Sequence, residues 1–194
     1  PTAAPEEGCN NPTNNQHTRD ALEKYGSNLL DGNVPGLDKY CPNYANLSRE
    51  QRIGFWTQFI NSVQKPESGC RSNAFGPEPD LSRPSQGLMQ LSYGDNPVCS
   101  KNRGACSSIS VSVDNAETAA GLSSTDSRRA INDPRNNLMC AVGIMDCLAT
   151  GGITSPDGRN NGYKGMDRYW SVLRDHRATD DVIRATALSY PGCQ

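Results

Sequence analysis

Residues 48–68 read SREQRIGFWTQFINSVQKPES and form the clearest helical segment of the chain. Ser48 is a suitable N-cap, because its hydroxyl can accept a hydrogen bond from an unpaired amide of the first turn, and Gln51 completes a capping box. Apolar side chains then repeat at helical spacing at Ile53, Trp56, Phe59, Ile60 and Val63. Pro66 interrupts the hydrogen-bond ladder, so the helix is predicted to end there, with Glu67 at or just beyond its C-terminus.

Glu67 therefore occupies an unusual electrostatic position. The C-terminal end of a helix carries partial negative charge, which disfavours ionisation of a nearby carboxyl group. The motif Gly87-Leu88-Met89-Gln90 begins twenty residues later and predicts a turn that brings the backbone back to the helix end. We expect the pKa of Glu67 to be raised, so that the group keeps its proton near neutral pH in a partly apolar cleft.

The eight cysteines are the strongest indication of the compartment in which the protein works. They contain no Cys-x-x-Cys pair, and the chain has only two histidines, so we expect no metal site. The pattern predicts a secreted or periplasmic protein with up to four disulfides, whose pairing the sequence leaves open. Cys140 and Cys147 lie two turns apart on a predicted helix, roughly 10 Å, so each must join that helix to another segment.

Charge and hydropathy argue against several other classes of protein. The 19 basic and 21 acidic side chains form no basic patch in the sequence, so we expect no nucleic-acid partner. No apolar run reaches the length of a membrane span, so we expect no membrane insertion, and any export signal is expected to have been removed. His17 lies in the predicted tail and His176 in a charged loop, so neither is a catalytic candidate. Ser68 lacks the nucleophile elbow of a serine hydrolase. We expect a monomer without a cofactor.

The other segments indicate one mainly helical domain after a short tail. Residues 1–17 are rich in Pro, Asn and Thr and predict the tail, so the domain spans 18–194. Asp133-Pro134, an N-cap followed by an N1 proline, predicts a second long helix that ends at Gly151-Gly152. We expect a helical domain with long disulfide-linked loops and at most a small sheet. Shorter elements are predicted as helices at 20–25, 166–173 and 179–190 and as a strand at 109–113.

Three motifs, in their order along the chain, resemble those of the lysozyme superfamily, in particular the soluble lytic transglycosylases and goose-type lysozymes. They are Glu67-Ser68, Gly87-Leu88-Met89-Gln90 and Asp133-Pro134-x-x-Asn137. Ala187-Leu188-Ser189-Tyr190 is similar to that family's Ala-Tyr-Asn segment, but Pro191 replaces the Asn. The resemblance covers roughly residues 48–190 and implies a mainly α, lysozyme-like α+β fold.

The resemblance also implies a glycosidase that cleaves peptidoglycan, with Glu67 as the general acid. Gln90 and Tyr190 would then line the sugar subsites, although Gln90 could instead bind the backbone of its turn and Tyr190 could belong to the core. Met89 is a further candidate contact, with packing as its preferred role. Peptidoglycan or a related amino-sugar polymer is the expected partner.

The span between Glu67 and the Gly-Leu-Met-Gln motif is longer than in that family. It carries two carboxylates between prolines, Glu78 and Asp80. A hydrolase that inverts the sugar configuration needs a base about 6.5–9.5 Å from the acid, so that a water molecule fits between them. We expect Glu78 to be that base, with Asp80 as its substitute or as a further substrate contact.

Two carboxylates in one cleft would suit a glycan that bears free amines, such as partly deacetylated peptidoglycan or a chitosan-like polymer. The cysteine-rich form with its inserted loop is similar to the deacetylation-specific lysozymes of predatory bacteria. Two alternatives stay open. One is a lytic transglycosylase, which forms 1,6-anhydro products without a second carboxylate; the other is a non-catalytic glycan-binding or inhibitor module.

Overall fold

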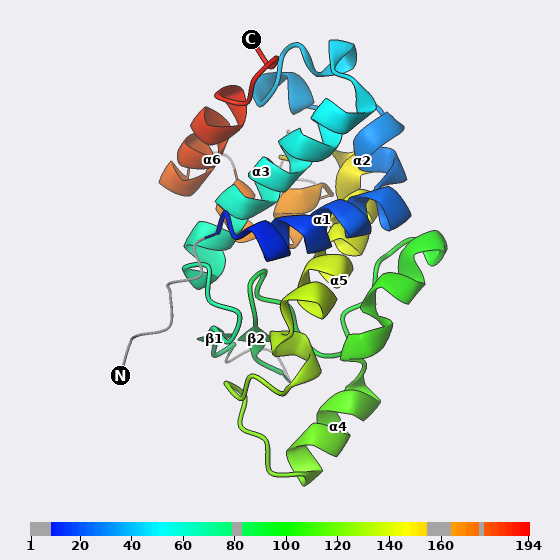
Figure 1. Ribbon diagram of the computed structural model, residues 1–194, viewed down its shortest axis with the longest axis vertical. Coiled ribbons are helices and arrows are strands. Elements are labelled where there is room, and N and C mark those ends of the chain that lie inside the picture. Colours follow the sequence, from blue (N-terminus) through cyan, green and yellow to red (C-terminus); the bar gives the residue numbers. More distant parts are fainter. Residues whose placement is uncertain (1–8, 79–82, 155–163, 175–176) are drawn as a thin grey trace.

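The computed structural model describes residues 9–78, 83–154, 164–174 and 177–194, and Asp80 and His176 lie outside these ranges. The described chain is mainly helical with one two-stranded sheet, which confirms the predicted fold class (Figure 1). The α-helices are α1 (Pro12–Tyr25), α2 (Ser27–Asp31), α3 (Arg49–Ser68), α4 (Val111–Ala119), α5 (Pro134–Leu148) and α6 (Ala178–Leu188). The antiparallel strands are β1 (Phe75–Gly76) and β2 (Ser85–Gln86).

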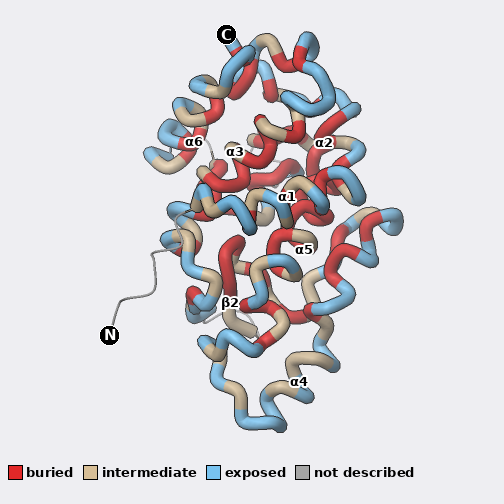
Figure 2. Tube along the Cα trace, viewed as in Figure 1, coloured by how far each residue is buried: buried red, intermediate tan, exposed pale blue. Residues whose placement is uncertain are grey.

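The core lies where α1, α3 and α5 meet. α1 packs against both of the other helices, and α6 covers another side of α3 (Figure 1). Buried residues follow the inner faces of α3 and α5, whereas α4 has no buried residue (Figure 2). Trp56, at a predicted apolar position of α3, and Trp170 are both almost completely buried. None of the helices in the described ranges is long and apolar enough to cross a membrane.

The helix α3 begins as predicted but ends later than predicted. The Ser48 hydroxyl accepts a hydrogen bond from the Gln51 amide at 3.2 Å, and the Gln51 side chain accepts one from the Ser48 amide at 2.8 Å. Pro66 lies within the helix, so the prediction that it ends the helix is wrong by two residues. Gly69, with φ of 60°, ends the helix, because glycine adopts this left-handed conformation without steric cost. Glu67 therefore belongs to the last helical turn.

All eight cysteines form disulfides, namely Cys9–Cys70, Cys41–Cys193, Cys99–Cys147 and Cys106–Cys140. Cys140 and Cys147 pair with Cys106 and Cys99 and not with each other, as their separation along the helix requires. Four disulfides are typical of a protein that folds in an oxidising compartment.

Three local predictions need correction. Residues 109–113 do not form a strand, because Ser110 accepts a hydrogen bond from the Val113 amide and caps the start of α4. α1 begins at Pro12, inside the predicted tail, because Asn11 caps it through the amides of Thr13 and Asn14. The segment 166–173 forms two short 3₁₀ turns, Met166–Arg168 and Ser171–Leu173, and not one helix.

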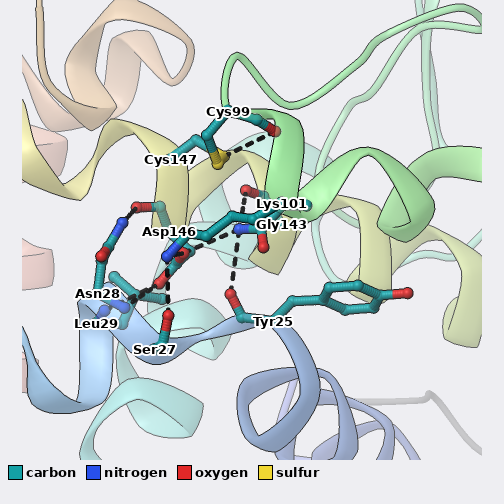
Figure 3. Close-up of a disulfide and its surroundings, with 10 residues drawn as sticks. Tyr25, Ser27, Asn28, Leu29, Cys99, Lys101, Gly143, Asp146 and Cys147 are labelled. Atoms are coloured by element: carbon teal, nitrogen blue, oxygen red, sulfur yellow. Dashed lines mark hydrogen bonds and ion pairs between the residues drawn. A yellow bond between two sulfur atoms is a disulfide. The ribbon is translucent and has the colours of Figure 1, made fainter.

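A buried carboxylate joins α5 to α2 beside a disulfide. The Asp146 side chain is completely buried, and its oxygens accept hydrogen bonds from the amides of Asn28 and Leu29 at 2.6 and 3.0 Å and from the Asn102 side chain at 2.9 Å (Figure 3). Lys101 lies 3.2 Å from the same carboxylate. Asp146 thus satisfies the unpaired amides at the start of α2.

Replacing Asp146 with Asn should lower the free energy of unfolding by about 2–3 kcal/mol, because charge-assisted hydrogen bonds are lost and an amide donor faces other donors. Urea denaturation measures the change. Asp38→Asn is the control, because Asp38 is exposed. If the two variants unfold at the same urea concentration, Asp146 does not have this structural role.

Candidate active site

Glu67 is partly buried in the last turn of α3. Burial, and to a smaller extent the charge of Glu78, raises the pKa of its carboxyl group to about 7. The upward shift of the Glu67 pKa agrees with the sequence prediction. Its main cause, however, is the loss of solvent around the carboxyl group and not the helix dipole. At neutral pH a large share of the molecules therefore carry a protonated Glu67.

Glu78 follows the strand β1 and is exposed to solvent. The Ser85 hydroxyl, on the neighbouring strand β2, donates a hydrogen bond to Oε1 of Glu78 at 3.0 Å. Glu78 lies close enough to Glu67 for its charge to affect the pKa of that group. The structure thus brings together the two glutamates that the sequence selects, while Asp80 lies outside the described residues.

The Gly87-Leu88-Met89-Gln90 turn is anchored to the start of α5. The Asn137 side chain accepts a hydrogen bond from the Met89 amide at 2.9 Å and donates one to the Gln86 carbonyl at 3.2 Å. Gly87 has φ of 78°, and a Cβ atom there would lie 2.2 Å from Nδ2 of Asn137. The turn therefore requires both the glycine and the asparagine. This contact explains why the two motifs occur together.

Met89 and Gln90 have structural partners in this turn. The Met89 side chain is fully buried, in agreement with the packing role that the sequence analysis prefers. The Met89 carbonyl accepts a hydrogen bond from Nε1 of Trp170 at 3.0 Å. The half-buried Gln90 side chain donates to the carbonyls of Gly87 and Ala74 at 3.0 and 3.4 Å. Its amide group thus ties the turn to the segment before β1, which is the alternative that the sequence left open.

Tyr190 does not lie near Glu67. Its ring packs edge-to-face against Phe55 with 6.0 Å between centroids, and its hydroxyl contacts Gly54. Gly54 precedes Glu67 by thirteen residues on the same helix, a distance of about 20 Å along the axis. The predicted role of Tyr190 in the same sugar subsites therefore needs correction.

Tyr169 and Asp95, which the sequence analysis does not select, occupy this region instead. The Tyr169 hydroxyl donates a hydrogen bond to Oδ2 of Asp95, which also accepts one from the Ser92 amide at 2.6 Å. The charge of Glu67 is among the causes that raise the pKa of Tyr169, so the two side chains are neighbours. Burial raises the pKa of Asp95.

Two features of the sequence could have indicated this pair. Asp95 follows the Gly-Leu-Met-Gln motif by five residues, and Tyr169 directly precedes Trp170, whose indole holds the same motif. Neither feature alone distinguishes a site residue from one in a turn or in the core. Within the described ranges, no cluster of His, Cys, Asp or Glu side chains is arranged to hold a metal ion.

The fold matches solved structures of Bd0314 DslA, a Bdellovibrio protein. The chain is similar to DslA along nearly its whole length. One DslA variant has a TM-score of 0.73 and 25% sequence identity, over 97% of this chain and 95% of DslA. Wild-type DslA has a TM-score of 0.67 and 26% identity, over 94% and 91% of the two chains.

A second DslA variant matches as well as the wild type does. Each of the two variants replaces one glutamate of DslA with glutamine, and the two positions are eleven residues apart in that protein. No family model matches the sequence of the present chain, and a comparison with curated proteins finds no match.

Proposed function

We propose that this protein is a glycoside hydrolase that cleaves the β-1,4 glycan strand of peptidoglycan. The observation that carries the proposal is the pairing of two carboxyl groups with different environments. Glu67 is partly buried and has a pKa of about 7, whereas Glu78 is exposed to solvent. Glu78 lies close enough for its charge to raise the pKa of Glu67. Pairs of carboxyl groups in unlike environments are the catalytic machinery of most glycosidases.

In the proposed mechanism, Glu67 is the general acid and Glu78 the general base. Glu67 gives its proton to the glycosidic oxygen as the bond from that oxygen to C1 breaks. Glu78 takes a proton from a water molecule on the opposite face of the sugar, and the water oxygen forms the new bond to C1. The product configuration is therefore inverted.

The similarity to DslA supports this assignment. The two glutamates substituted in the DslA structures are eleven residues apart, and so are Glu67 and Glu78. We assign Tyr169, held by Asp95, as the tyrosine that lines the sugar site in place of Tyr190. The four disulfides support action in a secreted or periplasmic setting, where the protein, as a monomer, would meet peptidoglycan.

We also propose that partly deacetylated glycan is preferred. The carboxylates of Glu78 and Asp95 lie in the region of the protonated Glu67, and their negative charge favours protonated amines over neutral acetamido groups. Glycan without the acetyl group also lacks the internal nucleophile on which a lytic transglycosylase depends, whereas a water-activating base has no need of it.

The test is digestion of acetylated and deacetylated peptidoglycan and of chitosan in ¹⁸O-labelled water. We expect labelled reducing ends with inverted configuration in early NMR spectra, and faster release from deacetylated material. Products with 1,6-anhydro ends would identify a lytic transglycosylase, and products of retained configuration would exclude Glu78 as a water-activating base. If none of the polymers is cleaved although they bind, the protein is a glycan-binding module.

A further inference from the structure

The Glu78 side chain is anchored to the strand β2. Ser85 donates its hydrogen bond to Glu78 from this strand. On one side of Ser85, the Pro84 carbonyl accepts a hydrogen bond from the Ser92 hydroxyl at 3.0 Å. On the other side, Gln86 pairs with Leu91 through two backbone hydrogen bonds of 2.7 and 2.9 Å. The backbone at Ser85 is therefore fixed to the turn that follows it.

A second anchor joins this segment to α4. Nε of Arg83 donates a hydrogen bond to Oδ2 of Asp114 on α4 at 3.0 Å. The other oxygen of Asp114 pairs with the guanidinium group of Arg129, which also lies 3.5 Å from Glu117. The Arg129 side chain is only 4% exposed. The Arg129 part of this network is shielded from solvent, so salt screens it less than a surface pair, whereas Arg83 is 30% exposed.

The ion pairs explain what α4 contributes to the fold. The helix has no fully buried residue, and the partly buried Val113 is its apolar contact with the core, so it contributes little by burial of apolar side chains (Figure 2). Its acidic residues Asp114 and Glu117 instead face Arg83, Arg129 and the amide of Ala130, which lies 2.7 Å from Glu117. α4 thus holds Arg83 beside a cluster of ion pairs.

We propose that Ser85 is a positioning residue that holds the carboxylate of Glu78 toward the site, and that α4 supports it by fixing Arg83. The inference rests on the proposed function, since it gives Glu78 the role of base. A solvent-exposed glutamate samples several rotamers, and only some of them place its oxygens where a water molecule can be activated. A hydroxyl on a fixed strand selects one of these conformations.

The first test is Ser85→Ala in the full chain, assayed by kcat and KM on deacetylated peptidoglycan. We expect kcat to fall about 10- to 100-fold with little change in KM, because the base is misplaced while the substrate contacts stay. Ser85→Thr keeps the hydroxyl and should restore most of the activity. Ser107→Ala is the matched control, because the exposed Ser107 hydroxyl donates a hydrogen bond to the Gly104 carbonyl within the 3₁₀ helix Ser100–Ile109.

The pH profile separates positioning from a general loss of structure. In the wild type the charge of Glu78 contributes to the raised pKa of Glu67. When Ser85→Ala lets Glu78 move away, the alkaline limb of kcat/KM should shift to lower pH, which a change in folding alone would not cause. A wild-type kcat, or a lower kcat with an unchanged pH profile, would overturn the inference.

The second test is Arg83→Gln, which removes the anchor to α4. We expect the same direction of change in kcat and pH profile with a smaller size, because Ser85 stays bound to its own turn. Arg128→Gln is the control, since Arg128 forms an exposed pair with Asp126 on a neighbouring loop. If Arg83→Gln behaves like this control, α4 has no role in holding the base.

The outcomes distinguish this inference from the proposed function. If Glu78→Gln has wild-type activity, Glu78 is not the base and the proposed mechanism fails. If Glu78→Gln is inactive while Ser85→Ala matches the wild type in kcat and pH profile, only the positioning role fails.

Discussion

Replacing Glu67 with Gln is expected to reduce glycan cleavage by about 10³-fold or more, because the amide cannot protonate the departing oxygen. The variant keeps the shape of the side chain, so binding of the polymer should persist. Release of reducing ends measures turnover, and co-sedimentation with insoluble wall material measures binding. Glu23→Gln is the control, since Glu23 is exposed on α1. Turnover at the wild-type rate would exclude Glu67 as the acid.

The pH dependence of the wild type provides an independent check on Glu67. Its pKa is raised from 4.5 to about 7 in the folded protein. The proton that the reaction needs is therefore present below pH 7 and is lost as the pH rises through about 7. We expect kcat/KM to decline over this range, whereas a glutamate with an ordinary pKa would have lost its proton well below neutral pH.

The same shift predicts that Glu67 costs stability at high pH. The folded-state pKa is above the unfolded value, so Glu67 is protonated in both states below about pH 4.5 and costs no stability there. Stability declines as the pH rises from about 4.5 through about 7, because the unfolded chain loses the proton first. Glu67→Gln should therefore be more stable than the wild type at pH 8, by about 1–3 kcal/mol after allowance for partial exposure, and should show little difference at pH 4. Thermal or urea unfolding at both values tests this, and equal differences at pH 4 and pH 8 would contradict it.

The second large effect is expected for Glu78→Gln. Hydrolysis should fall by about 10²- to 10⁴-fold, because no base remains to take the proton from water. Loss of the charge should also lower the pKa of Glu67, so the alkaline limb of the residual activity should move to lower pH. Both changes are measured on deacetylated peptidoglycan, again with Glu23→Gln as the control.

The products of Glu78→Gln decide between two mechanisms on the same fold. A lytic transglycosylase uses groups of the substrate itself and would keep its rate and its 1,6-anhydro products in this variant. A hydrolase that depends on Glu78 would lose its labelled reducing ends. Wild-type hydrolysis by Glu78→Gln would move the role of base to another group, with Asp80 as the first candidate for substitution.

The sequence alone determined the features that depend on near neighbours in the chain. The capping box at Ser48 and Gln51 and the N-cap at Asp133 are formed within one turn, so local residue types are enough to predict them. The even number of cysteines predicted disulfides, and the two-turn spacing of Cys140 and Cys147 on the predicted helix excluded their pairing with each other. The position of Glu67 in the last turn of α3 followed within two residues.

Only the tertiary structure decided which distant residues meet. Tyr169 binds Asp95 across 74 positions of the chain, whereas Tyr190, in the segment that resembles the family motif, lies at the other end of α3. The main cause of the raised pKa of Glu67 is burial by the surrounding fold, which no local pattern reveals. The physical reason is that caps and helical stripes depend on contacts within a few residues, while burial, disulfide partners and the neighbours of a carboxyl group depend on how the helices pack.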